Sequence, residues 1–222
     1  MDCPERERAQ WWGDVVNMTG QAFYSLAPDS SRLTQKGIFE LANWQRADNT
    51  IYAPIPTGNW KIELKCQMLN SVGYFGFWTY YLYTGDLETI RSVYPAVKRY
   101  MSLWKIGDDG LLVSRGGSWT DWGENKDHPI LFNAWYYLAL RGQKLMAEAI
   151  GETADIPDIE ARMASIEKNF NKTFWTGTEY RSPGYKDKTD DRGHAWAVLA
   201  GLAGPDKYEA IRKVFATQEQ SS

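Results

Sequence analysis

Apolar residues recur at intervals of three and four positions along most of the chain, in segments separated by turn and capping signals. This spacing is that of an amphipathic α-helix, so it favours an almost entirely helical fold. Pro28-Asp29-Ser30 can turn the chain and cap a helix, and Gly85-Asp86 combines a C-cap glycine with an N-cap aspartate. The expected helices cover residues 8–26, 38–44, 67–83, 90–100, 130–150, 156–170, 192–203 and 206–215.

Three connections depart from the helical pattern. The proline-rich stretch at 53–58 is too long and irregular for a tight turn between helices. Asp109-Gly110 followed by Leu-Leu-Val predicts a turn that leads into a short strand, and residues 175–180 predict a hairpin. Loops of this kind are where binding residues concentrate on a helical scaffold.

The expected helices number about eight and form four antiparallel pairs, in which buried helices alternate with half-exposed ones. This alternation is typical of an all-α toroid, the (α/α)6 six-hairpin barrel, whose inner helices are ringed by outer ones. Such a barrel needs six pairs to close, and fewer would expose apolar surface. We therefore expect residues 1–222 to form a single domain with an incomplete barrel; a smaller helical array is the alternative.

Charge and composition exclude several classes of partner. A formal net charge of −3 provides no basic surface for nucleic acid or an anionic membrane, and no apolar run approaches the ~20 residues that span a bilayer. Cys3 and Cys66 make no disulfide framework, while His128 and His194 lack further ligands at metal-site spacing. We expect no metal, no cofactor, no nucleic acid and no membrane; the compartment and the oligomeric state stay open.

Aromatic residues form 14% of the chain, including eleven Trp and thirteen Tyr. Both side chains combine a flat apolar face with a polar edge, which matches the apolar C–H faces and hydroxyl edges of a pyranose ring. Packing between helices accounts for part of these residues. The excess points to a carbohydrate ligand.

Acidic residues gather beside tryptophans at the start of the chain, at Asp2, Glu5, Glu7 and Asp14. Glycoside hydrolysis needs one carboxylic acid to protonate the leaving oxygen and a second carboxylate on the opposite face of the sugar. Glu7, Trp11 and Asp14 are spaced four and three residues apart, which would place them on one helix face. The alternative is a solvated helix start whose acids are favoured by the helix dipole.

The segment Asp-Cys-Pro-Glu-Arg-Glu-Arg-Ala-Gln-Trp-Trp-Gly-Asp at 2–14 resembles the signature of bacterial α-L-rhamnosidases, glycoside hydrolase family 78. Similar stretches follow at Tyr83-Thr-Gly-Asp86, Val93-Tyr-Pro-Ala-Val-Lys98, Ser118-Trp-Thr-Asp-Trp-Gly123, Lys188-Thr-Asp-Asp-Arg192 and Ala195-Trp-Ala-Val-Leu-Ala-Gly201, so the resemblance covers nearly the whole chain. It implies the N-terminal two-thirds of an (α/α)6-barrel catalytic domain that hydrolyses terminal α-L-rhamnosides with inversion.

The resemblance also implies roles for individual residues. Glu7 matches the general acid, and Trp11 matches an aromatic wall of the sugar pocket. The residues that match hydroxyl-binding positions are Asp2, Arg6 and Asp14, and those that can supply a second wall or a nearby acid are Trp119, Trp122 and Asp121. The implied partner is a rhamnose-containing oligosaccharide or glycoside.

Two departures from the family pattern concern the pocket. Many members have Gly-Trp-x-Asp where this chain has Cys66-Gln-Met-Leu-Asn-Ser71, so Gln67 or Asn70 can provide polar contacts there instead. The family's Gly-Asp-Trp reads Gly117-Ser118-Trp119, which removes one acid. The general base, a glutamate in the family, is expected beyond Ser222, so the chain by itself is expected to be inactive.

Two other functions stay open at this stage. One is another α/α-barrel glycosidase, such as a glucoamylase-like enzyme or an unsaturated-uronyl hydrolase, although these lack the 2–14 motif. The other is a non-catalytic carbohydrate-binding or structural helical domain.

The segment Asp190-Asp191-Arg192 is expected to cap a helix with a charged partner; a role in the pocket is the alternative. His194 is expected to be a packing residue.

Overall fold

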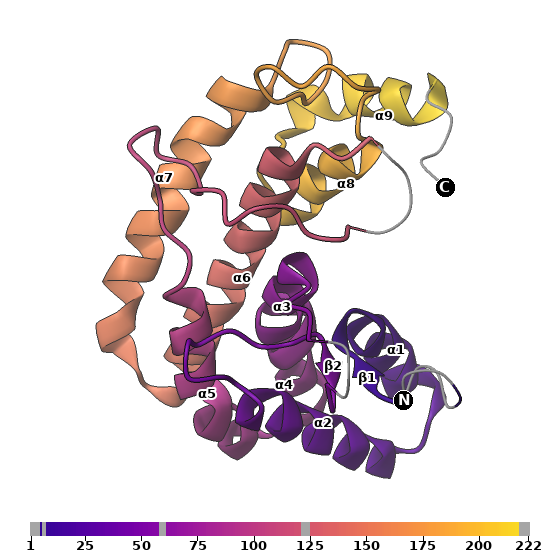
Figure 1. Ribbon diagram of the computed structural model, residues 1–222, viewed down its shortest axis with the longest axis vertical. Helices are drawn as coiled ribbons and strands as arrows, with labels where there is room; N and C mark the ends of the chain where they lie inside the picture. Colours follow the sequence, from indigo (N-terminus) through magenta and orange to yellow (C-terminus); the bar gives the residue numbers. More distant parts are fainter. Residues whose placement is uncertain (1–4, 6–7, 58–60, 121–124, 218–222) are drawn as a thin grey trace. The chain divides into compact units, whose positions relative to one another are not determined.

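The computed structural model describes residues 5, 8–57, 61–120 and 125–217. Helices dominate these residues (Figure 1), which confirms the all-α prediction. The helices are α1 Trp12–Ser25, α2 Ser31–Asn43, α3 Lys65–Val72, α4 Thr79–Thr84, α5 Leu87–Met101, α6 His128–Ile150, α7 Ile156–Phe174, α8 Asp191–Ala200 and α9 Tyr208–Thr217. Short helical turns are η1 Pro28–Ser30, η2 Tyr74–Trp78, η3 Thr153–Asp155 and η4 Pro205–Lys207, and the two strands are β1 Gln10–Trp11 and β2 Pro54–Ile55.

The chain divides into two compact units. Unit 1 comprises residues 1–104 and 138–160, and unit 2 comprises residues 105–137 and 161–222. The chain therefore passes from one unit to the other within α6 and again within α7. The single domain expected over residues 1–222 stays a prediction.

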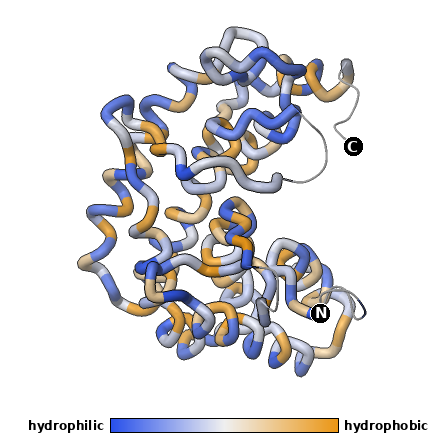
Figure 2. Tube along the Cα trace, viewed as in Figure 1, coloured by the Kyte–Doolittle hydropathy of each residue, from blue (hydrophilic) through white to orange (hydrophobic). Residues whose placement is uncertain are grey.

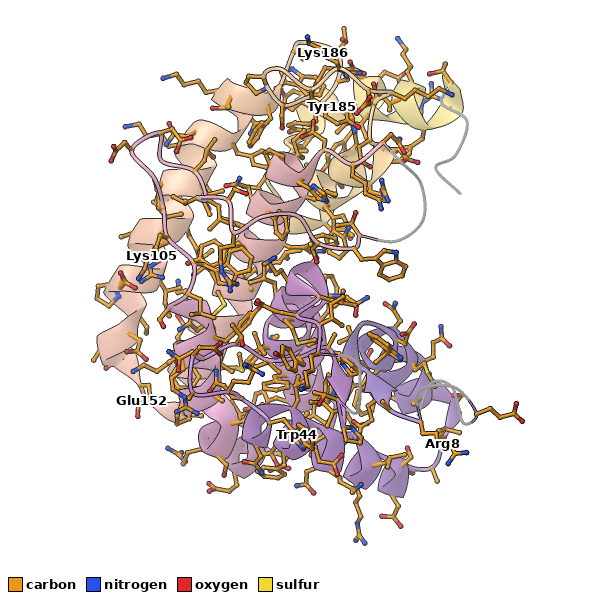
Figure 3. All side chains as sticks on the ribbon, in the orientation of Figure 1. Arg8, Trp44, Lys105, Glu152, Tyr185 and Lys186 are labelled. Carbon is orange, nitrogen blue, oxygen red and sulfur yellow. The ribbon has the colours of Figure 1, made fainter. Side chains whose placement is uncertain are left out.

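Unit 1 is built from amphipathic helices that pack in pairs. Helix α1 packs on α3, and α2 packs on α5. Ile38 and Leu41 lie three residues apart on α2 and are both fully buried, so one face of this helix enters the core. Hydrophobic and hydrophilic residues alternate along α2 accordingly (Figure 2). Trp44 ends this helix at the surface (Figure 3).

The Gly85-Asp86 boundary has the predicted capping geometry. Gly85 takes a left-handed conformation (φ 67°), and its N–H donates to the carbonyl of Tyr81 at 2.8 Å. The carboxylate of Asp86 then accepts the N–H of Thr89 at 3.1 Å at the start of α5. One residue pair thus ends α4 and begins α5, as the sequence predicts.

The helix predicted from residue 8 begins four residues later. Gln10 and Trp11 form β1, which pairs antiparallel with Pro54 and Ile55. The sequence prediction of this helix start was wrong because the pairing joins segments about forty residues apart, which periodicity cannot reveal. Arg8, beside the start of α1 in Figure 3, has a positive φ of 54°.

The single helix predicted over 67–83 is divided into α3, η2 and α4. Helix α6 crosses at this point so closely that a Cβ on Gly142 would lie 2.4 Å from the backbone N of Tyr74. A Cβ on Gly73 would lie 2.7 Å from the Cα of Ala139. The helix widens here into a five-residue turn in which the N–H of Trp78 donates to the carbonyl of Gly73 at 3.2 Å. Backbones in contact thus explain why glycines occupy both sides of the crossing.

Unit 2 contains the two irregular connections that the sequence predicts. Ile106 and Leu112 form a bridge around a turn at Gly110 (φ 75°), and Trp175 and Tyr180 form the second bridge. Helix α8 packs on α9. The predicted turn at Asp109-Gly110 and the predicted hairpin at 175–180 are confirmed, whereas the strand predicted after Gly110 is reduced to the single bridge at Leu112.

Candidate active site

The start of α1 is fixed by Trp12, which is 1% exposed and makes an edge-to-face contact with Phe77. The next residue, Gly13, lies against the side-chain amide of Gln67 on α3. A Cβ on Gly13 would be only 2.5 Å from the carbon of that amide. The Oε1 atom of Gln67 is buried and accepts no hydrogen bond within the described part of the chain. Gln67 thus lies against the acidic motif, and a buried acceptor without a partner is a candidate for a ligand hydroxyl.

The other described residues of the motif are at the surface. Trp11 is partly exposed in β1, and Asp14 is exposed in the first turn of α1. A carboxylate in a first turn is favoured by the helix dipole. The prediction that Trp11 shares a helix face with Asp14 was wrong, because Trp11 precedes the helix in an extended conformation (φ −82°, ψ 111°).

Several predicted site residues lie outside the described residues: Asp2, Arg6, Glu7, Asp121 and Trp122. Their roles stay predictions. Trp119, the remaining candidate, belongs to unit 2 and is 42% exposed.

Two side chains hold the backbone on either side of Trp119. The Nε2–H of His128 donates to the carbonyl of Ser118 at 3.2 Å, and the guanidinium of Arg192 donates to the carbonyl of Thr120 at 3.0 Å. The same guanidinium donates to the carbonyl of Asn125 at 2.8 Å. These bonds hold the carbonyls on both sides of Trp119, a residue whose indole would suit the apolar face of a ligand.

Asp190 joins this arrangement to α8. As predicted, its carboxylate caps the helix by accepting the N–H of Arg192 at 3.2 Å, and it pairs with the Arg192 Nε at 2.8 Å. It also accepts the N–H of Asp127 at 3.0 Å. The carboxylate of Asp127 in turn accepts the N–H of Ser182 at 2.7 Å and the Ser182 hydroxyl. Burial raises the pKa of Asp127, with the charge of Asp190 adding to this effect and the bonds from Ser182 opposing it.

His194 is a satisfied packing residue, as predicted. It is fully buried, its Nε2 accepts the N–H of Tyr180 at 2.8 Å, and its Nδ1–H donates to the carbonyl of Asp190 at 3.1 Å. Both ring nitrogens are therefore used when the imidazole is neutral. Burial lowers the pKa of His194 below 6.5, although the bond to the Asp190 carbonyl opposes the shift.

The neutral state of His194 makes stability depend on pH. Below about pH 6.5 the unfolded imidazole takes up a proton that the folded one excludes, so stability is expected to fall as the pH drops from there toward the folded pKa. In His194→Gln the amide oxygen can accept the Tyr180 N–H without titrating. The loss of melting temperature between about pH 7.5 and 5.5 should be smaller in this variant than in the wild type. Equal losses would contradict the assignment.

Neither metal ligation nor membrane insertion is indicated by the described residues. Within them, no three His, Cys, Asp or Glu side chains gather as a metal site would require. Over the same residues, no helix combines the length and apolarity needed to cross a membrane.

A family model described as the bacterial alpha-L-rhamnosidase 6 hairpin glycosidase domain matches residues 1–222. The chain belongs to this family. The predicted resemblance of the chain to bacterial α-L-rhamnosidases is thereby confirmed, together with the six-hairpin fold class.

Solved rhamnosidases have the same fold as this rhamnosidase domain. The family 78 rhamnosidase of Bacillus sp. GL1 superposes with a TM-score of 0.85 at 20% identity, covering 100% of this chain and 24% of that one. The α-L-rhamnosidase of Dictyoglumus thermophilum gives 0.79 at 20% identity, covering 97% and 25%. That of Streptomyces avermitilis, complexed with L-rhamnose, gives 0.69 at 17% identity, covering 97% and 20%. The chain thus spans about a quarter of the length of these proteins, and a comparison with curated proteins gave no match.

The sequence did not reveal every residue that organises the rhamnosidase domain. It indicated Asp190 and Arg192 as a cap with a charged partner, but not that Arg192 reaches Thr120 and Asn125. It also missed Asp127 and Ser182. These partners are 55 to 72 residues apart, and no local pattern signals a bond to a backbone carbonyl.

Proposed function

We propose that this chain forms the acid-bearing part of an active site that hydrolyses terminal α-L-rhamnosides with inversion. The observation that carries the proposal is the match of the rhamnosidase domain over residues 1–222, since this range includes the acidic segment at 2–14. The last residue of this segment, Asp14, is exposed in the first turn of α1, which supports it.

In this mechanism Glu7 donates its proton to the glycosidic oxygen as the bond from that oxygen to the anomeric carbon breaks. A water molecule attacks the anomeric carbon from the opposite face and passes its proton to a carboxylate base beyond Ser222. The new C–O bond therefore forms with inverted configuration. The two carboxyl groups should be about 6.5–9.5 Å apart to leave room for the water.

Carboxylate groups and one guanidinium group would bind the hydroxyl groups of the sugar, and aromatic side chains would pack against its ring. Asp2, Arg6 and Asp14 would bind the rhamnose hydroxyls, and Trp11 would pack against the ring. Trp119 or Trp122 would form a second wall. The exposed indole of Trp119 supports this role, and an apolar ring face against an indole is a favourable contact for a pyranose.

Gln67 is the replacement that we propose for the family's tryptophan-containing segment. Its buried Oε1, which accepts no hydrogen bond from the residues that the structure describes, lies against Gly13, between Trp12 and Asp14 in the sequence. A small rearrangement of the amide would let it accept a sugar hydroxyl. The proposed partner is a rhamnose-containing oligosaccharide or glycoside, as the family suggests and as the L-rhamnose complex of the Streptomyces enzyme supports.

A panel of nitrophenyl glycosides tests the proposed function on the complete protein. We expect cleavage of the α-L-rhamnoside well above that of α- and β-glucosides, with β-L-rhamnose as the first product detected by proton NMR. Release of the α anomer first would contradict inversion. Preference for a glucoside or an unsaturated uronide would instead identify another α/α-barrel glycosidase, and binding without turnover would indicate a carbohydrate-binding domain.

A further inference from the structure

The guanidinium of Arg192 joins Asp190 to Thr120 and Asn125 within the described part of unit 2. Its Nε pairs with the Asp190 carboxylate at 2.8 Å, and its two terminal nitrogens donate to the carbonyls of Thr120 and Asn125 at 3.0 and 2.8 Å. The Arg192 side chain is 18% exposed and that of Asp190 is 1% exposed. Solvent therefore competes little with this charge-assisted network.

The two carbonyls border one segment of the chain. Thr120 and Asn125 are the residues on either side of 121–124, and Thr120 directly follows Trp119. A planar guanidinium has donors in a fixed fork, so a single side chain can fix both carbonyls at once. A lysine ammonium at the same position would have no such fixed fork.

The guanidinium group of Arg192 is itself held in place by other side chains of unit 2. The Asp190 carboxylate that orients it also accepts the N–H of Asp127, and Asp127 is bound to Ser182. On the other side of Trp119, His128 holds the carbonyl of Ser118. Trp119 thus lies between two anchored carbonyls, and the residue as a whole is 42% exposed. Fixed backbone beside an exposed indole is the arrangement that a stacking wall requires, because a preorganised ring loses little freedom on binding.

We propose that Arg192 is a positioning residue that sets the place of the Trp119 wall through the carbonyls of Thr120 and Asn125. The inference rests on the proposed function, in which Trp119 contacts the rhamnoside. Arg192 acts through the backbone and does not touch the substrate.

The test is Arg192→Gln and Arg192→Lys in the complete protein with an aryl α-L-rhamnoside. The contact of the Trp119 indole with the sugar has the same strength in the ground state and in the transition state. Displacement of Trp119 is therefore expected to raise KM more than it lowers kcat. We expect kcat/KM to fall about 10- to 100-fold in Arg192→Gln, with most of the change in KM. Arg192→Lys should recover only part of the loss, because it keeps the charge without the fork.

Arg181 provides a matched control in the same unit. It pairs with Glu179 at 2.9 Å and donates to the carbonyl of Asp187 at 2.8 Å, in the loop where Figure 3 labels Tyr185 and Lys186. Arg181→Gln should lower the melting temperature about as much as Arg192→Gln but leave KM within about twofold of the wild type. An equal rise of KM in both variants would mean general loosening of the unit and would overturn the proposal.

Hydrogen–deuterium exchange supplies a readout that does not depend on activity. Peptides that span 117–126 should exchange faster in Arg192→Gln than in the wild type or in Arg181→Gln. Unchanged exchange, or a wild-type KM in Arg192→Gln, would overturn the role of Arg192. A wild type that cleaves no α-L-rhamnoside would instead contradict the proposed function, so the two failures are distinguishable.

Discussion

In the complete protein, Glu7→Gln is expected to lower kcat about 10²- to 10⁴-fold on rhamnosides whose aglycone is a poor leaving group, since general acid catalysis contributes about this much. The amide keeps the size of the side chain but has no proton to donate to the glycosidic oxygen. An activated leaving group such as nitrophenolate needs less protonation, so the loss should be smaller with nitrophenyl rhamnoside. Steady-state kinetics with both substrates measure the difference.

The neighbouring Glu5→Gln is the control for Glu7→Gln. Glu5 belongs to the same acidic segment and is exposed, and the mechanism assigns it no role. Its replacement should leave kcat within about threefold of the wild type. The assignment of Glu7 would be wrong if both variants lost activity alike, or if Glu7→Gln kept normal turnover with the poor leaving group.

A large loss of stability is expected for Gly142→Ala. The new Cβ would lie 2.4 Å from the backbone N of Tyr74 and 2.5 Å from the carbonyl carbon of Gly73, so α6 and the chain at η2 would have to separate. Overpacking of this kind typically costs about 1–3 kcal/mol. Thermal unfolding of the complete protein should show a clearly lower melting temperature.

Gly20→Ala is the matched control, because Gly20 lies inside α1 and a Cβ there would meet no atom within 4 Å. Alanine in a helix interior is about 0.5–1 kcal/mol more favourable than glycine, so this variant should be slightly more stable than the wild type. We therefore expect Gly142→Ala to lower the melting temperature and Gly20→Ala to raise it slightly. Stabilisation by both would mean that the crossing at Gly142 is not tightly packed.

Features determined by local chemistry could be predicted from the sequence. The Gly85-Asp86 boundary, the cap at Asp190 and the turn at Gly110 depend on residues within a few positions of each other. Such signals act through the side chain or the φ angle of the residue itself. The helical periodicity likewise predicted the all-α fold, since it records which side of each helix is buried.

Features determined by contacts between distant segments could not be predicted. The late start of α1 depends on pairing between Trp11 and Pro54, and the division of the helix after Val72 depends on Gly142 of another helix. The same holds for the site. The 2–14 motif could be assigned by resemblance, but the contacts of Arg192 with the Thr120 and Asn125 carbonyls required the folded chain.

The bonds from Arg192 also bear on which positions of unit 2 can be changed without loosening the chain. Both acceptors are peptide carbonyls, which every amino acid possesses, so the anchoring does not depend on the side chains at 120 or 125. Exchange of the side chain at 120 or 125 would therefore leave both of these hydrogen bonds in place. An enzyme engineer could accordingly vary these two positions while keeping Arg192 and Asp190, on which the anchoring depends.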